Sequence, residues 1–201
     1  NMFKALITGS IGSGKSTACK LFAELGIPIF YSDLQARRVV NSDKEAIIQI
    51  KKEFGEHLYA NGELDRKALA DIVFNDKNKL SILNSIVHPK VSQAFDSWVG
   101  MNEVFEDSEY VIEEAAIAIE LGIHDKFDFI VVVTADEDVR IRRTMERDKC
   151  SEEKVRERMN NQLSDKEKLK YADAVIINND FPNLECQVRA VHKKILDRIK
   201  K

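Results

Sequence analysis

Short, almost continuous apolar runs recur along the chain and predict five β-strands. They cover residues 3–7, 27–31, 110–112, 129–133 and 174–177. Strands that are apolar on both sides are typical of parallel sheets with both faces covered, and helix-patterned segments separate these runs. The pattern therefore predicts an α/β protein with a five-stranded parallel sheet covered by helices. Ligands bind such sheets at the carboxyl ends of the strands, which makes Gly9, Asp33 and Glu113 candidates by position.

Between the second and third runs, residues 42–100 carry only helical periodicity. Ser42 and Glu45 form a possible capping box at the start of the first helix. A later helix near residues 77–87 is expected to end by His88, because Pro89 disfavours helical geometry in the residue before it and can open the next helix. The stretch is too long for a simple crossover, so we expect a separate helical subdomain.

The motif GSIGSGKS, residues 9–16, directly follows the first strand and directly precedes a helical pattern. It matches G-x-x-x-x-G-K-[ST], a loop whose backbone N–H groups cradle phosphates. Its glycines permit positive φ, Lys15 can reach the β- and γ-phosphates, and the Ser16 hydroxyl can bind Mg²⁺. The nucleotide-binding residues predicted from the motif are Gly12, Ser13, Gly14, Lys15 and Ser16.

A densely charged helical segment occupies residues 136–171, and Ser151 and Ser164 are each predicted to be the N-cap of a helix within it. Any single arginine in it could simply form a surface ion pair. As a cluster, we interpret these arginines as a lid that closes over ATP, because phosphoryl transfer needs cations around the transferring group and exclusion of water. Arg140, Arg143 and Arg147 are the candidates for phosphate contact, and the last two are favoured.

Composition narrows the class of protein. The chain has 201 residues, a formal net charge of −3, 44% hydrophobic and 32% charged residues, which suits one α/β core with an appended subdomain. The chain does not have the excess of basic residues that would indicate a nucleic-acid partner. Its 3 cysteines lack metal-ligand spacing. No apolar run is long enough to cross a membrane and the first residues show no signal-peptide pattern, so we expect a cytoplasmic protein.

A phosphate-binding loop alone is compatible with motors, GTPases, transporter ATPases and small-molecule kinases. The chain has no Asn-Lys-x-Asp sequence for reading guanine, and its third strand ends in Glu113-Glu114 without the Asp usual for a Walker B motif. One helical insertion and one arginine-rich segment in a chain of this size fit a small kinase better.

The sequence resembles the dephospho-coenzyme A kinase family. The resemblance covers essentially the whole chain, and the shared motifs occur in the same order as in the family. The residues that carry the resemblance are GSIGSGKST at 9–17, Ser32-Asp33, GELDR at 62–66, IVHP at 86–89, RTMERD at 143–148, Gln162, Ala172-Asp173 and Asn178-Asn179. The resemblance implies a kinase of the P-loop NTP hydrolase-like fold that transfers the γ-phosphate of ATP to the ribose 3′-hydroxyl of dephospho-coenzyme A, with Mg²⁺.

Residue roles follow from the same resemblance. Asp33 matches the proposed catalytic base and would hold Mg²⁺ together with Ser16. Lys15 and Arg143 would act on the transferred phosphoryl group. Acceptor-binding residues would be Arg66 and His88, and further contacts to ATP would come from Thr17, Arg147 and Asn179.

Simpler interpretations stay open for several of these residues. Asp33 also suits the first turn of a helix, where its charge is stabilised by the helix dipole. Arg66 could be an ordinary surface arginine, and His88 a histidine bonded to backbone at a helix end. The Asn178-Asn179 segment could be a plain turn.

The expected organisation is a core of residues 1–41, 101–135 and 172–201, a helical acceptor subdomain of residues 42–100 and a lid of residues 136–171.

Three features depart from the family: Tyr31 replaces an Asp, residues 115–120 replace a Pro-Leu-Leu-Phe-Glu tract, and Ser10 replaces a common glycine. Another small-molecule kinase of the nucleoside monophosphate kinase type and a non-catalytic nucleotide-binding module are the alternatives. We expect a monomer or weak homo-oligomer without nucleic-acid or membrane partners.

Overall fold

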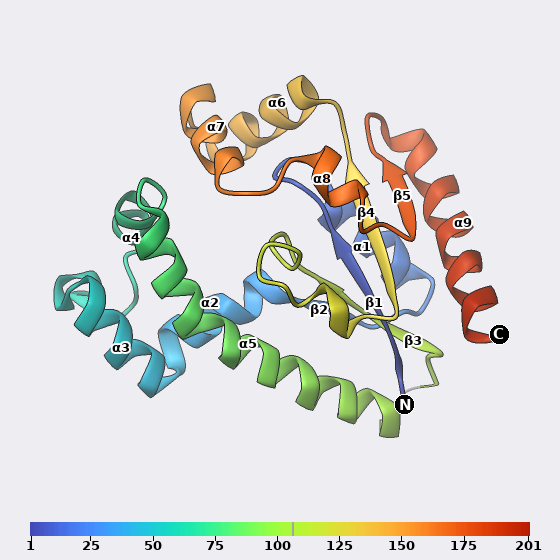
Figure 1. Cartoon of the computed structure of the whole chain (residues 1–201), viewed down its shortest axis with the longest axis horizontal. Coiled ribbons are helices and arrows are strands. Elements are labelled where there is room, and N and C mark those ends of the chain that lie inside the picture. Colours follow the sequence, from blue (N-terminus) through green and yellow to red (C-terminus); the bar gives the residue numbers. More distant parts are fainter. Residues whose placement is uncertain (106) are drawn as a thin grey trace. The chain divides into compact units, whose positions relative to one another are not determined.

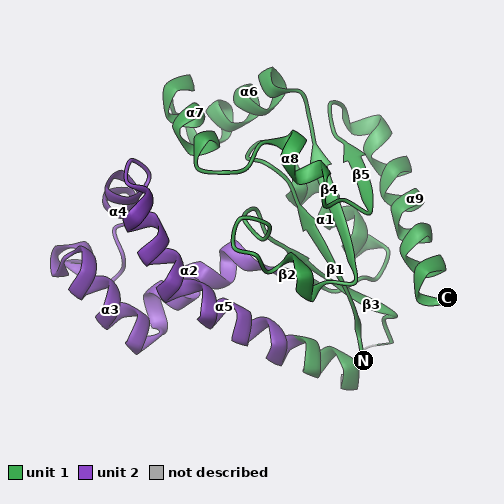
Figure 2. Ribbon diagram, viewed as in Figure 1, with its two compact units in different colours: residues 1–30, 99–201 green, residues 31–98 purple. Residues whose placement is uncertain are grey.

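The computed structural model describes residues 1–105 and 107–201 (Figure 1). The chain folds into two compact units, one of residues 1–30 and 99–201 and one of residues 31–98 (Figure 2). The first unit contains almost all of the β-sheet, and the second consists of helices. The finer division into core, acceptor subdomain and lid stays a prediction.

Five strands form a single sheet in the order β2-β3-β1-β4-β5 (Figure 1). The strands are β1 (Phe3–Thr8), β2 (Ile29–Tyr31), β3 (Tyr110–Glu114), β4 (Phe129–Thr134) and β5 (Ala174–Ile177). The central strand β1 pairs in parallel with β3 and β4, and β4 pairs in parallel with β5. The predicted α/β class and five-stranded parallel sheet are confirmed.

Helices and loops cover the apolar strands of the first unit. Helix α1 (Lys15–Glu24) contacts β1 and β3, and α9 (Phe181–Ile199) packs along α1 and β5. A buried cluster joins Leu6, Ile130 and Val132 to Ala115 and Ala118 of the segment after β3. Ile123 and Phe127, beside the short helix η2 (His124–Lys126), pack against that cluster. Within residues 1–105 and 107–201, no helix is long and apolar enough to span a membrane.

The charged segment forms three helices, α6 (Glu137–Asp148), α7 (Glu152–Asn160) and α8 (Asp165–Leu169). Ser151 and Ser164 cap α7 and α8 by accepting hydrogen bonds from the N–H groups of Lys154 and Glu167 at 3.4 and 3.2 Å, which confirms both predicted N-caps. Helices α6 and α7 pack together, and Arg156 forms ion pairs with residues of both.

The second unit contains α2 (Ser32–Ser42), α3 (Lys44–Phe54), η1 (Glu56–Tyr59), α4 (Arg66–Val73) and most of α5 (Lys77–Phe105). The cap of α3 is Asp43 and not Ser42, so the capping-box prediction was wrong. The Asp43 carboxylate accepts from Ala46 N at 2.9 Å, whereas the Ser42 hydroxyl donates to Arg38 O at 2.5 Å in the preceding helix.

The prediction that a helix ends by His88 was also wrong, because α5 runs through Pro89 without interruption. A proline inside a helix costs about 3 kcal/mol through a lost hydrogen bond and a steric clash. The apolar face of α5 continues across it, and Ile86, Val91 and Phe95 are all buried. Burial of one continuous face offsets the local cost, which the preference of the residue before proline does not reveal.

Tyr59 joins η1 to the end of α2. Its buried hydroxyl donates to Val40 O at 2.8 Å, and Asn41 Oδ1 accepts from Leu64 N at 2.9 Å nearby. Burial raises the pKa of Tyr59 from 10.0 to about 12. The neutral phenol is therefore favoured by the folded state.

We expect Tyr59→Phe to lower the free energy of unfolding by about 1 kcal/mol, since Val40 O loses its buried donor. The Tyr59 contribution is fully present below pH 10.0 and is lost as the pH rises toward about 12, because the unfolded phenol ionises first. Urea unfolding followed by circular dichroism at pH 7 and across the alkaline range measures both effects. Tyr171→Phe, at an exposed tyrosine, is the control, and equal losses for the two variants would contradict the assignment.

Candidate functional site

The predicted phosphate loop connects the end of β1 to the start of α1. Gly12 and Gly14 have φ values of 77° and 83°, so the backbone turns as the motif requires. Four N–H groups of the loop donate no hydrogen bond to any residue that the structure describes: those of Gly12, Gly14, Lys15 and Ser16. The Lys15 ammonium likewise forms no ion pair with a described residue. Unsatisfied N–H groups at a helix N-terminus beside an unpaired cation form an anion-binding site.

Close packing leaves no room for a side chain on the loop glycines. A Cβ on Gly9 would lie 2.2 Å from Val133 O, and one on Gly12 would lie 2.3 Å from Arg140 O. A Cβ on Gly14 would lie 2.1 Å from Asn178 Nδ2. The loop is thus enclosed by β4, α6 and the segment after β5.

Asn178 fixes the loop from the far end of the chain. Its Nδ2 donates to Ser13 O at 3.0 Å, and its own N–H donates to Thr134 O at 2.7 Å. The neighbouring Asn179 is exposed, and its Oδ1 accepts from Asp136 N at 2.8 Å. The sequence placed this segment near the nucleotide, but it carried no sign that Asn178 binds the loop itself.

We expect Gly14→Ala to weaken ADP binding by at least about tenfold, because the new methyl group displaces Asn178 and distorts the loop. Gly26→Ala is a matched control, since Gly26 has nearly the same φ, 85°, with open space around its Cβ position. Isothermal titration with ADP compares them. If Gly14→Ala binds ADP as tightly as Gly26→Ala does, the close contact between Gly14 and Asn178 is not needed for nucleotide binding.

The three candidate arginines of α6 have different surroundings. Arg143 lies against the loop, with Nη1 donating to Gly12 O and Nη2 to Asn179 O, both at 3.4 Å. Arg140 is buried and its Nε donates to Ala135 O at 3.1 Å, which makes it part of the packing. Arg147 is on the surface and pairs with Asp148 at 2.7 Å. Of the three, the structure brings Arg143 to the phosphate loop.

Lys168 of α8 is a buried cation near the same loop. Its side chain is 0% exposed, and its Nζ lies 2.9 Å from Ala116 O and 3.4 Å from Glu120 Oε2. Burial lowers the pKa of Lys168, Glu120 raises it, and the charge of Lys15 lowers it. Lys168 therefore lies within electrostatic range of the predicted phosphate-binding lysine.

Lys168→Ala should lower the free energy of unfolding by about 3 kcal/mol, because it leaves the Glu120 carboxylate without its buried partner. Lys166→Ala on the same short helix removes an exposed lysine and should change little. Chemical unfolding of both variants measures the difference. Similar stabilities would show that the Lys168–Glu120 pair contributes nothing.

The predicted acceptor residues lie in the second unit. Asp33 is exposed in the first turn of α2, Arg66 is exposed at the start of α4, and His88 is half-buried within α5. Burial and the neighbouring Arg37 lower the pKa of Arg66, while Asp33 raises it. The guanidinium groups of Arg66 and Arg37 form no hydrogen bond or ion pair with any residue that the structure describes. Two unpaired arginines near Asp33 form an electropositive surface suited to an anionic ligand.

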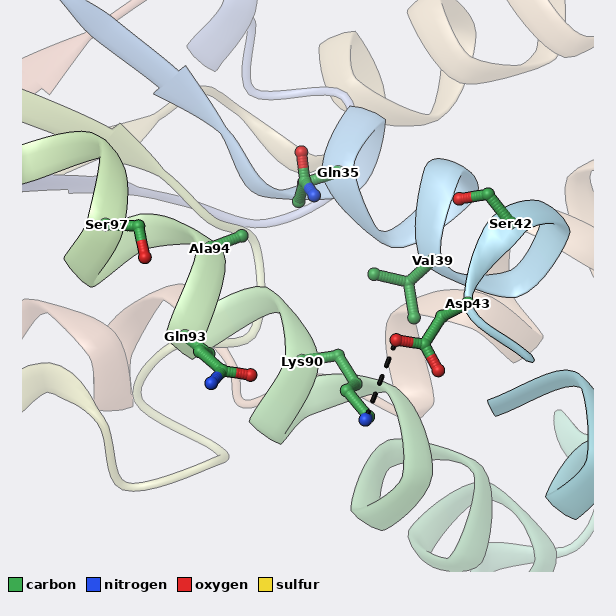
Figure 3. Close-up of a pocket in the computed structure, with 8 residues that line it drawn as sticks. All are labelled: Gln35, Val39, Ser42, Asp43, Lys90, Gln93, Ala94 and Ser97. Carbon is green, nitrogen blue, oxygen red and sulfur yellow. Dashed lines mark ion pairs between the residues drawn. The ribbon is translucent and has the colours of Figure 1, made fainter. Parts of the chain in front are cut away.

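A separate pocket of about 390 Å³ lies between α2 and α5 (Figure 3). The Lys90 side chain extends toward Asp43, with the ion-pair atoms 3.6 Å apart, and it also pairs with Glu45 at 2.6 Å. The remaining lining is made of neutral side chains, including Gln35 and Gln93. None of the predicted acceptor residues lines this pocket.

The Ser16 hydroxyl is the predicted Mg²⁺ ligand within the loop. Among the described residues, no group of three or more His, Cys, Asp or Glu side chains could hold a metal ion. Mg²⁺ commonly takes one or two protein ligands together with phosphate oxygens and water. The exposed Ser16 hydroxyl beside the free N–H groups of the loop fits that mode.

Comparison with known proteins gives consistent matches. A family model described as dephospho-CoA kinase matches residues 5–183. The dephospho-CoA kinase of Chlorobaculum tepidum is 39% identical over 200 residues, covering 94% of this chain and 93% of that protein. The crystal structure of TT1252 from Thermus thermophilus has a TM-score of 0.82 at 30% identity and covers 96% of this chain and 98% of its own. The structure of dephospho-CoA kinase from Campylobacter jejuni has a TM-score of 0.68 at 27% identity, with 96% of each chain covered.

Proposed function

We infer that this chain, which belongs to the dephospho-CoA kinase family, phosphorylates dephospho-coenzyme A with ATP to give coenzyme A. The family match over residues 5–183 carries this conclusion. The loop at Gly12 to Ser16, with N–H groups and a lysine that no described residue pairs, supports ATP as the phosphoryl donor. The γ-phosphate would pass to the ribose 3′-hydroxyl.

On the donor side, we assign the β- and γ-phosphates to the N–H groups of the loop and to Lys15. Ser16 would hold Mg²⁺, which supplies charge neutralisation at the phosphates when it is bound, and Thr17 next to it would contact ATP. Arg143, already against Gly12 O, is the arginine best placed to reach the transferred group. Arg147 would have to leave Asp148 to do so, and Asn179 would contact the nucleotide farther from the phosphates.

On the acceptor side, the Asp33 carboxylate would accept the proton of the attacking hydroxyl and would also lie near Mg²⁺. Arg66 and His88 would bind dephospho-coenzyme A. The guanidinium groups of Arg66 and Arg37, unpaired within the described chain, suit the phosphate groups of this acceptor. A cytoplasmic location, a monomeric or weakly oligomeric state and the absence of nucleic-acid partners remain predictions from the sequence.

The function is tested by measuring ADP release with dephospho-coenzyme A in parallel with a panel of nucleoside monophosphates. We expect turnover with dephospho-coenzyme A that exceeds turnover with every nucleotide of the panel. Preference for a nucleotide would favour a nucleoside monophosphate kinase. ADP binding without any turnover would favour a non-catalytic binding module.

We expect Asp33→Asn to lower kcat by about 100-fold or more, because the amide cannot accept the hydroxyl proton. Its affinity for ADP should stay within about twofold of the unchanged chain, since Asp33 is assigned to the acceptor side. Asp71→Asn removes another exposed carboxylate of the second unit and serves as the control. Retention of full activity by Asp33→Asn would exclude Asp33 as the base.

A further inference from the structure

We propose that Asp165 is a positioning residue that holds the phosphate loop in its nucleotide-binding conformation through Ser10; this inference rests on the proposed use of the loop for ATP. Ser10 lies in the first half of the phosphate loop. It is buried, with 4% of its surface exposed, so its hydroxyl needs a hydrogen-bond partner within the protein. Asp165, 155 residues later in the chain, supplies that partner.

The Asp165 carboxylate joins four parts of the first unit. One oxygen accepts a hydrogen bond from Ser10 Oγ of the loop. The other accepts from Thr134 Oγ1 at the end of β4 and lies 3.6 Å from Arg140 Nε of α6. Asp165 itself belongs to α8. One largely buried carboxylate therefore sets the position of the loop relative to the strand and the two helices that surround it.

The role of Asp165 is distinct from that of a helix cap. Ser164 caps α8 and accepts the hydrogen bond from Glu167 N. The side chains of Asp165 and Arg140 are only 16% and 8% exposed, and each provides the opposite charge for the other. A carboxylate balanced in this way can hold the loop without presenting a net negative charge to the phosphates that the loop binds.

Gln162 adds a second link from the same segment. Its Oε1 accepts from Ile11 N at 3.0 Å, and Ser10 O accepts from Ser13 N at 3.1 Å within the loop. The first half of the loop is thus bonded to the protein. The N–H groups from Gly12 onward that no described residue accepts remain for the ligand. Because the first half of the loop is fixed, the N–H groups of the second half point in a set direction. Loss of Asp165 should therefore weaken nucleotide binding more than acceptor binding.

The test compares Ser10→Ala, Asp165→Ala and the double variant, with Glu167→Ala as a matched control on the same helix. ADP affinity is measured by titration calorimetry without any acceptor, and KM and kcat are measured for both substrates. We expect Asp165→Ala to raise the Kd for ADP and the KM for ATP about tenfold, and Ser10→Ala about threefold. The KM for dephospho-coenzyme A should change less than about twofold.

The double variant should bind ADP as Asp165→Ala does, because both substitutions remove the same hydrogen bond. Unchanged ADP affinity in Ser10→Ala, a conservative change expected to fold, would overturn the proposal. So would a lower melting temperature of Asp165→Ala without a change in Kd, or effects of the two variants that multiply.

Failure of the proposed function gives a different result. If the unchanged chain binds ADP but does not phosphorylate dephospho-coenzyme A, weaker ADP binding by Asp165→Ala still supports the positioning role. If the chain phosphorylates dephospho-coenzyme A and Asp165→Ala binds ADP normally, only the positioning role is wrong.

Discussion

The first unit is organised around one constraint: the backbone between β1 and α1 must turn tightly while several of its N–H groups stay available to a ligand. A loop of unsatisfied donors does not hold its own shape, so the surrounding elements must hold it. They do so at close range, because Val133, Arg140 and Asn178 occupy the space that side chains on Gly9, Gly12 and Gly14 would need. The parallel sheet brings these distant segments to one edge, since the carboxyl ends of its strands lie together.

The sequence predicts the features that depend on local patterns. Apolar runs locate the strands, glycine spacing locates the phosphate loop, and Ser151 and Ser164 mark helix starts, since each signal is complete within a few residues. The long helix α5 is different. Its continuity through Pro89 depends on a buried face that extends on both sides of the proline, and local backbone preference alone gives the wrong answer.

The candidate site also combines residues that a local pattern predicts with residues that only the fold brings together. Lys15 and Ser16 could be identified from the motif, but the partners that hold the loop could not. Asn178 lies 165 residues from Ser13, and Asp165 lies 155 residues from Ser10. Only the fold brings these pairs together, and both Asn and Asp are common enough that neither residue stands out. Arg140 was a candidate for phosphate contact but is buried in the packing around the loop. Sequence spacing cannot distinguish an arginine that supports the loop from one that reaches a ligand.

The Ser10–Asp165 contact also restricts the order in which the two positions can change during evolution. If Ser10 is replaced by glycine first, the carboxylate keeps Thr134 and Arg140 and the chain loses one hydrogen bond. If Asp165 is lost first, two hydroxyl groups lose their hydrogen-bond acceptor and the buried Arg140 guanidinium loses its ion-pair partner in a single step. The first route therefore removes fewer buried contacts than the second. A serine at this place in the loop thus adds one more contact that the chain would lose if the aspartate far along the sequence were replaced.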